Sequence, residues 1–231
     1  TEETRPVLTG VQAEFEGDTI TFAAADGFRL AVYKSPSLSP VAEREVVIIP
    51  ARTLGELSRL LLASEEEPVE MVINPQRSQM LVRLKDIELV SQLIQGTFPN
   101  YSQLIPQSYG TRAVVDASEF LRATRTASIF ARDGSSIIRL QITPGEGGMA
   151  GRVTISARAE EVGDNIGEVD AIVDGDEAKI AFNSRYLIEV LSVLHGGNVA
   201  LETTASSSPG VIRPTGSDNY VHVVMPMFVQ W

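Results

Sequence analysis

Histidine, serine and carboxylate side chains are the groups that could support catalysis, because the chain has two histidines and no cysteine. The lack of cysteine excludes disulfides, thiol nucleophiles and thiolate metal sites. No G-x-S-x-G, S-x-x-K or H-E-x-x-H motif is present. His195 ends a predicted helix, where an imidazolium would favour the helix dipole, and His222 lies in a predicted strand. We interpret both as structural, and predict no catalytic residue, metal ion or cofactor.

Arginines at helical spacing are the second group of side chains that could support a function. Arg122 and Arg125 are three residues apart on one predicted helix, which Arg132 follows, and Arg52 and Arg59 are seven apart on another. Guanidinium groups on one helix face concentrate positive potential and bind phosphates without reading bases. Ordinary solvent-facing helix surfaces would produce the same pattern. Both interpretations stay open on these residues alone.

The overall charge limits how nucleic acid could bind. The 19 basic and 30 acidic residues give 19 − 30 = −11, which argues against polyanion binding over the whole surface but permits a local basic face. Apolar residues make up 43% of the chain and charged residues 21%, as in folded globular proteins. The apolar stretches are far shorter than the roughly 20 residues that span a bilayer. We expect a cytoplasmic protein with no membrane segment, and because the chain starts at Thr1, a piece of a longer one.

Strands dominate the predicted secondary structure. Apolar residues alternate through residues 11–33, interrupted at Gly17 and at Asp26-Gly27, which is typical of hairpins. Similar alternation occurs at residues 69–73, 80–84, 87–93, 137–142, 153–157, 199–203 and 220–225.

Three helices are predicted at residues 52–62, 117–130 and 184–194, from apolar residues at helical spacing. Each follows an apolar strand and begins at a residue suited to a helix start, namely Pro50, Asp116 or Asn183. These starts lie 66 and 67 residues apart. Such regularity predicts an internal repeat in which a strand and a helix are followed by several strands.

Four separated motifs resemble the bacterial DNA polymerase III beta subunit family, the sliding clamps. They are Arg-Pro-Val-Leu-Thr-Gly-Val at residues 5–11, Ala-Asp-Gly-Phe-Arg-Leu-Ala at 25–31, Gly-Thr-Phe-Pro-Asn-Tyr at 96–101 and Val-Met-Pro-Met at 224–227. They occur in the family's order and, with the repeat, extend over nearly the whole chain.

The resemblance implies an α+β fold built from strand-helix-strands units, with antiparallel sheets outside and helices on the inner face of a ring. It implies that residues 1–108 are a second clamp domain lacking its first strand and helix, and that residues 109–231 are a complete third domain. The family forms a head-to-tail homodimer, and by position Ile129 and Phe130 would lie at its interface. Ring closure by this piece alone is therefore not expected.

The resemblance also implies function without catalysis: a ring encloses duplex DNA and tethers polymerases to it. Weak, sequence-independent contacts suffice, and Arg52, Arg59, Arg122, Arg125 and Arg132 would face the DNA. Partners implied by the family are DNA polymerase III subunits, the clamp loader and repair polymerases, which insert short peptides into a hydrophobic groove.

Carried over by motif, the groove residues come from the segments around the four motifs. They are Leu8, Gly27, Phe28, Arg29, Leu30, Pro99, Leu104, Val223, Met225, Pro226 and Met227. Flexible methionines suit a pocket that accepts different peptides. For Leu8, Leu30 and Val223, core packing is an open alternative.

Two departures from the family pattern affect the groove. Ala25 stands where many members have threonine, and the chain ends in Phe-Val-Gln-Trp, where most members have a basic residue and one aliphatic residue. Peptide preference therefore cannot be carried over with the fold. Two other functions remain open: a sheet-rich peptide-binding module that does not encircle DNA and, less favoured, a hydrolase with scattered carboxylates.

Overall fold

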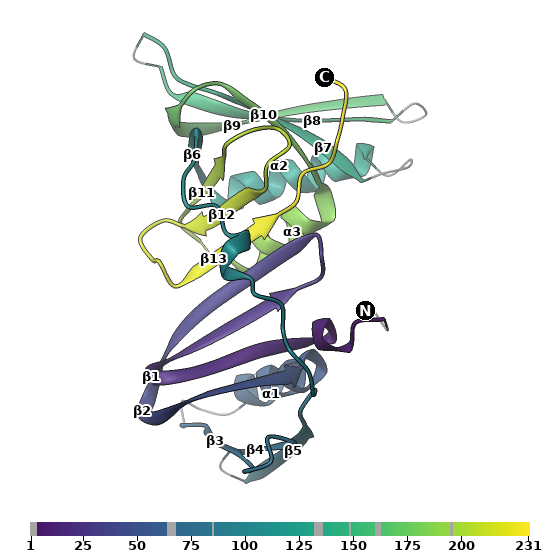
Figure 1. Ribbon diagram of the computed structural model, residues 1–231. Helices are drawn as coiled ribbons and strands as arrows, with labels where there is room; N and C mark the ends of the chain where they lie inside the picture. The colour runs from purple at the N-terminus through teal and green to yellow at the C-terminus, as the bar shows by residue number, and fades with distance from the viewer. Residues whose placement is uncertain are drawn as a thin grey trace. The chain divides into compact units, whose positions relative to one another are not determined.

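The computed structural model describes residues 4–63, 68–84, 86–131, 136–147, 149–159, 163–194 and 196–231 (Figure 1). Contacts divide the chain into two compact units. Unit 1 comprises Thr1–Gly27 and Ala31–Asn100, and unit 2 comprises Phe28–Leu30 and Tyr101–Trp231. The predicted Arg132 and His195 lie outside the described residues.

Unit 1 combines long strands, one α-helix and a small sheet. Its elements are η1 (Pro6–Thr9), β1 (Gly10–Ala25), β2 (Arg29–Pro50, of which residues 31–50 belong here), α1 (Ala51–Ala63), β3 (Glu70–Ile73), β4 (Gln79–Leu84) and β5 (Ile87–Gln92). Strands β3, β4 and β5 pair antiparallel in sequence order. The apolar residues at every second position of β4, from Met80 to Leu84, are buried and form a core with Ile49 and Leu57.

Unit 2 has two α-helices packed on a larger antiparallel sheet. Its elements are η2 (Ser102–Leu104), β6 (Thr111–Asp116), α2 (Ala117–Phe130), β7 (Ile137–Thr143), β8 (Gly151–Ala159), β9 (Gly163–Gly175), β10 (Ala178–Asn183), α3 (Ser184–Val193), β11 (Asn198–Thr203), β12 (Gly210–Pro214) and β13 (Tyr220–Val224). The described strands follow one another across the sheet as β13-β12-β11-β6-β9-β8-β7-β10. Helix α2 packs on β8 and β9, and the two helices contact each other.

The predicted repeat is visible in unit 2 as two successive runs of strand, helix and three strands. The opening strand of each run pairs with a strand of the other run: β6 pairs with β11 of the second run, and β10 pairs with β7 of the first. Strand β6 also pairs with β9 of its own run, which makes the sheet continuous. The second run is divided by the first, because β10 lies beside β7 whereas β11, β12 and β13 lie beyond β6.

The starts of α2 and α3 are held by similar hydrogen bonds. The Asp116 side chain accepts a hydrogen bond from the backbone N–H of Glu119 (2.8 Å), and the Asn183 side chain accepts one from Arg185 (3.0 Å). Both predicted caps are therefore confirmed. The first backbone N–H of each helix donates to the opposite run, from Ala117 to the Gly197 carbonyl (3.0 Å) and from Ser184 to the Ser136 carbonyl (2.7 Å).

The predicted fold class is confirmed, since the described chain is rich in antiparallel strands and has helices close to the three expected ranges. Strands β9 and β12 were not predicted from the sequence pattern. Most of β9 is exposed on both sides, and only Val169 and Ala171 are buried, so its sequence lacks a long apolar alternation. The turn expected at Gly17 lies within β1 as assigned, where Gly17 has a φ of 57°.

The two residues that precede β7 and β11 give a matched test of backbone strain. Ser136 and Gly197 both adopt left-handed φ values, 54° and 73°. A side chain is unfavourable there, and nothing lies within 4 Å of a Cβ built on Gly197, so the effect of adding one is conformational. We predict that Gly197→Ala lowers the free energy of unfolding by about 1 kcal/mol, whereas Ser136→Gly raises it slightly. Urea denaturation of both variants measures this, and equal losses would contradict it.

Candidate functional site

The segment Phe28–Leu30 lies beside the end of β13. The backbone N–H of Met225 donates a hydrogen bond to the carbonyl oxygen of Phe28 (2.8 Å). The preceding Gly27 has a φ of 88°, in the left-handed region that favours glycine, so the Asp26-Gly27 turn is suited to this sequence. The structure thus brings together two of the predicted motifs although nearly 200 residues separate them.

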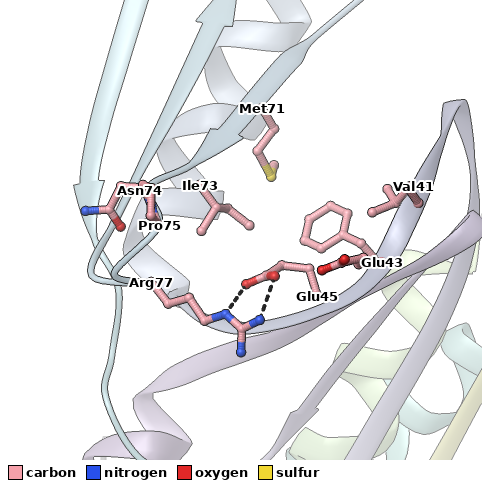
Figure 2. Close-up of a pocket in the computed structure, with 10 residues that line it drawn as sticks. Val41, Glu43, Glu45, Met71, Ile73, Asn74, Pro75 and Arg77 are labelled. Carbon is pink, nitrogen blue, oxygen red and sulfur yellow. Dashed lines mark hydrogen bonds and ion pairs between the residues drawn. The ribbon is translucent and has the colours of Figure 1, made fainter.

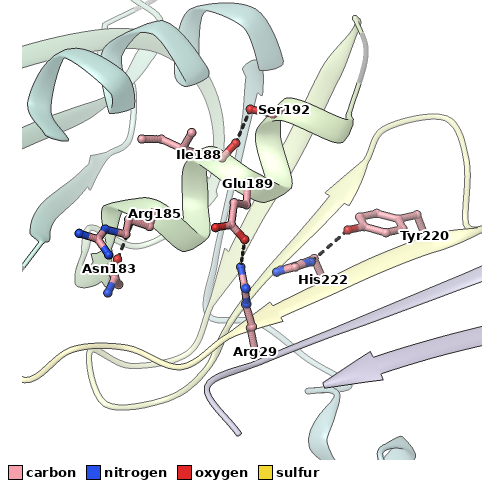
Figure 3. Close-up of polar contacts among 8 residues, drawn as sticks. All are labelled: Arg29, Asn183, Arg185, Ile188, Glu189, Ser192, Tyr220 and His222. Atoms are coloured by element: carbon pink, nitrogen blue, oxygen red, sulfur yellow. Dashed lines mark hydrogen bonds and ion pairs between the residues drawn. The ribbon is translucent and has the colours of Figure 1, made fainter. Parts of the chain in front are cut away.

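Helix α3 supplies an aromatic partner for this segment. The rings of Phe28 and Tyr186 stack with centroids 6.4 Å apart and an interplanar angle of 24°. The Arg29 guanidinium carbon lies 4.6 Å from the centroid of the Tyr186 ring, and Arg29 Nη1 donates a hydrogen bond to Glu189 Oε2 (Figure 3). Tyr186 and Glu189 are three residues apart, so they share one face of the helix. The result is a compact cluster of two aromatic rings and one ion pair.

Part of this cluster is exposed apolar surface. Phe28 is 57% exposed and Met225 is 43% exposed, while Tyr186 is half-buried. Pro226 is buried, and Met227 is half-buried with its backbone N–H donating to the Ala181 carbonyl (2.8 Å). An apolar patch with charged groups at its edge is the kind of surface that binds another apolar chain.

The other predicted groove residues differ in burial and in the unit to which they belong. Leu30 and Val223 are only 3% and 4% exposed, as the core-packing alternative for these two residues expects. Leu104 lies in η2 of unit 2 and is exposed. Leu8, Gly27 and Pro99 belong to unit 1; Leu8 is half-buried, and Pro99 is exposed. That these residues join Phe28 and Met225 in one groove stays a prediction.

Sequence reasoning missed Tyr186 and Glu189. Both follow the Asn183 cap at the start of α3, and nothing in the local pattern separates them from ordinary surface residues of a helix. The signal that could have identified them is their spacing, because an aromatic and a carboxylate three residues apart can contact one arginine together. The arginine itself is 160 positions away in the chain.

A tyrosine–histidine pair lies on the strand that leads to Met225. The hydroxyl of Tyr220 is 3.0 Å from Nδ1 of the buried His222. Burial raises the pKa of Tyr220 to about 12, and the positive charge of Arg29 opposes that shift. Figure 3 shows both side chains on the Arg29 side of α3. His222 is thus buried and in contact with a polar partner, and its structural role stays a prediction.

Four of the five arginines predicted to face DNA lie among the described residues, on the exposed surfaces of α1 and α2, and three of these four have contacts. Arg122 lies 3.8 Å from Glu119, and Arg59 lies 2.9 Å from Glu56. Arg125 donates a hydrogen bond to Ser192 Oγ on α3 (3.2 Å). Arg52 is exposed near the start of α1. These contacts lower the local positive potential without removing it, since only two of the contacts involve a carboxylate.

The predicted dimer-interface residues are at the end of α2. Ile129 is exposed, and Phe130 is half-buried against the core of unit 2. The exposed side chain of Ile129 is available for a contact with another chain. The structure holds one chain, so the interface stays a prediction.

Unit 1 contains a separate cavity of about 520 Å³. Its wall includes Phe15, Met71 and Ile73, and an ion pair crosses one side of it (Figure 2). Arg77 contacts Glu45 twice, through Nε to Oε1 (2.6 Å) and through Nη2 to Oε2 (2.9 Å). Because the two charges neutralise each other, this cavity offers no unpaired group from that pair to a ligand.

Two family profiles match the chain almost from end to end. Residues 1–100 match the DNA polymerase III beta subunit, central domain, and residues 102–228 match its C-terminal domain. A beta sliding clamp from Bacillus subtilis is 32% identical over 229 residues, which are 98% of this chain and 58% of that protein. This chain therefore spans little more than half the length of such curated relatives.

Solved structures give the same result. A DNA polymerase sliding clamp from Bacillus subtilis superposes with a TM-score of 0.90 at 31% identity, over 100% of this chain and 59% of that one. The DNA polymerase III subunit beta from Pseudomonas aeruginosa gives 0.89 at 28% identity, over 99% of this chain and 61% of that one. The chain belongs to the DNA polymerase III beta subunit family, the bacterial sliding clamps.

The described residues hold no group of three or more His, Cys, Asp or Glu side chains that could bind a metal ion. Among the same residues, no helix is long and apolar enough to cross a membrane.

The raised pKa of Tyr220 gives a test of its burial. The unfolded chain loses the tyrosine proton near the ordinary pKa of 10.0, but the folded chain keeps it until about 12. The stabilisation that this pKa difference provides is therefore complete below pH 10 and is lost as the pH rises toward 12. We predict that Tyr220→Phe abolishes this part of the pH dependence of unfolding. Ultraviolet titration should show one late tyrosine that the variant lacks, and a Tyr220 that titrates near 10 would contradict the prediction.

Proposed function

We propose that this chain is the peptide-binding part of a DNA sliding clamp, a non-catalytic ring that encloses duplex DNA in the cytoplasm and tethers replication and repair polymerases to it. The observation that carries the proposal is the Phe28, Tyr186 and Met225 surface in a chain that belongs to the clamp family. Its partners are DNA polymerase III subunits, the clamp loader and repair polymerases. Each inserts a short extended peptide.

The chemistry of this surface favours an apolar peptide. Phe28 exposes a flat ring and Met225 a flexible thioether, and the backbones of the two residues are hydrogen-bonded. Met227 lies two residues after Met225. Aromatic and methionine side chains supply large contact areas and adapt to different partners. The remaining predicted groove residues, Leu8, Gly27, Pro99 and Leu104, would extend the contact along the peptide.

Truncating an anchor should weaken peptide binding selectively. We predict that Phe28→Ala and Met227→Ala each reduce the affinity for an extended apolar peptide by about 1 to 3 kcal/mol, because central apolar contacts carry much of the energy of an interface. Met149→Ala is the matched control, since Met149 is an exposed methionine on the distant β7–β8 connection. Calorimetric titration of a capped, extended apolar peptide measures the effect, with thermal melts to check folding. Equal losses in Met149→Ala and Met227→Ala would place the peptide site elsewhere.

DNA binding is proposed to depend on enclosure by a ring. Arg52, Arg59, Arg122, Arg125 and Arg132 would line the hole and attract phosphates without reading sequence. The chain carries a net charge of −11, which repels DNA from most of its surface. A closed ring would form from longer chains by homodimerisation, with Ile129 and Phe130 at the contact.

Linear DNA should therefore bind poorly to this chain. We predict weak, strongly salt-dependent binding to a short linear duplex, which decreases further in Arg122→Glu/Arg125→Glu. Filter binding at low and physiological salt measures both effects, and Arg152→Glu on the β8 surface is a control for the loss of positive charge. Tight binding that persists at physiological salt would favour direct recognition over enclosure.

The domain organisation is also a proposal. We infer that residues 1–108 act as a second clamp domain that lacks its first strand and helix, and residues 109–231 as a third domain. Support comes from the repeat in unit 2, where each run opens with a strand and a helix, whereas the described part of unit 1 contains one α-helix. The contact division after Asn100 and the profile limits at 100 and 102 lie several residues before the boundary inferred from sequence.

A further inference from the structure

We propose that the cavity between β2 and β3 in unit 1 accepts one additional β-strand, followed by an amphipathic helix that packs on α1. The occupant is a strand and helix supplied by a part of the protein outside this chain. This chain spans 58% of the length of a beta sliding clamp from Bacillus subtilis, so such proteins have ample chain outside the matched part. The inference deepens the proposed domain organisation and rests on it.

Strand β3 has one paired edge and one open edge. The backbone N–H of Asn74 donates to the carbonyl of Gln79 on β4 (3.0 Å), and N–H groups alternate between the two edges of an antiparallel strand. The N–H groups of Met71 and Ile73 therefore point away from β4. Among the described residues, β3, β4 and β5 form a sheet of their own, so no strand reaches these two groups. An open edge of this kind is a template for another strand.

Unit 2 provides the comparison, because β11 and β12 repeat the pairing of β3 and β4. Ile73 on β3 is opposite Met80 on β4. The register of β11 and β12 continues to place Thr203 opposite Gly210, so the two hairpins have equal length. Position for position, Ile73 corresponds to Thr203.

The corresponding edge of β11 is occupied in unit 2. Strand β6 lies there and pairs antiparallel with β11 on one side and with β9 on the other. The backbone N–H of Gly110, just before β6, donates to the carbonyl of Thr203 (2.9 Å). Helix α2 follows β6 directly and contacts α3. A strand between β2 and β3, with a helix against α1, would complete unit 1 in the same way.

The apolar residues of unit 1 are less covered than their counterparts in unit 2. Met71 on β3 and Leu54 on α1 are half-buried. Leu201 holds the place of Met71 on β11, and Leu187 is the fourth residue of α3, as Leu54 is of α1. Both counterparts are fully buried. Unit 1 is therefore open at the place that β6 and α2 occupy in unit 2.

The cavity of about 520 Å³ lies where this comparison puts the additional strand. Met71 and Ile73 of β3 line one side of it, and Val41 of β2 lines another (Figure 2). All three side chains are half-buried and pack against the core of unit 1. A strand with apolar residues at alternate positions would cover them, because such side chains all point to one face. The cavity wall thus fits an extended apolar segment.

A synthetic peptide with the sequence of Thr111–Phe130 is the probe, because this segment is the strand and helix that fill the equivalent place in unit 2. We expect it to slow hydrogen exchange of the Met71 and Ile73 amides by about tenfold or more, since strand addition gives both groups acceptors. The Val72 amide, which points to β4, is the internal control and should not change. Nuclear magnetic resonance measures each amide separately.

Two control experiments locate the contact. The same peptide with Ala113→Pro and Val115→Pro should give no protection, because proline cannot donate a backbone hydrogen bond. In the protein, Val41→Asp should abolish the protection by placing a charge against the apolar strand. Val90→Asp is its matched control, since Val90 on β5 is 63% exposed and does not line the cavity. Thermal melts check that both variants fold.

A fusion of the peptide before Thr1 through a flexible linker keeps the test decisive, because linking raises the effective concentration to about millimolar. Protection of Met71 and Ile73 by either form supports the inference. If neither form protects them, the inference is overturned and the domain organisation still stands. Protection without peptide that grows with protein concentration would make a second copy the occupant and also overturn it. Slow exchange in the dilute chain alone would mean a closed edge, and the domain organisation would fail too.

Discussion

The pairing of each opening strand of unit 2 with a strand of the other run is the constraint on which the rest of the unit depends. Because β6 pairs with β11 as well as with β9, and β10 pairs with β7, the strand that leads into each helix pairs with a strand of the other run. The hydrogen bonds from Ala117 to Gly197 and from Ser184 to Ser136 fasten the helix starts at the same places. Most of these contacts join residues that are far apart in sequence, so the unit forms as a whole.

Charged residues reinforce this pairing on the sheet surface. Glu202 on β11 lies 3.3 Å from Arg112 on β6 and 3.3 Å from Arg213 on β12. One carboxylate therefore bridges three neighbouring strands, including the opening strand β6. The partly buried position of Glu202 makes these contacts less screened by salt than the ion pairs on the helices.

The peptide surface is a consequence of that arrangement. Strand β10 fixes the start of α3, so the first turns of the helix place Tyr186 and Glu189 beside the end of β13. Met225 follows β13 directly, and its backbone holds Phe28. Arg29 lies at this apolar surface and contacts the carboxylate of Glu189. That carboxylate comes from α3, whose position the sheet determines.

The sequence by itself determined the local elements, the repeat and the family. The helix starts at Asp116 and Asn183, the 66- and 67-residue spacing and the Met-Pro-Met ending are all local patterns, and local patterns reflect the backbone preferences of neighbouring residues. Strand β9 was missed because few of its residues are buried, so its apolar alternation is too short to detect.

Only the tertiary structure decided which residues form the site. It buried Leu30 and Val223, left Phe28 and Met225 exposed, and added Tyr186 and Glu189. Sequence spacing could not give these assignments. Alternation along a strand does not show which residues are exposed, because that depends on which face another element covers. The Arg29–Glu189 pair joins positions 160 residues apart, and a contact at that separation exists only once the sheet has placed both residues.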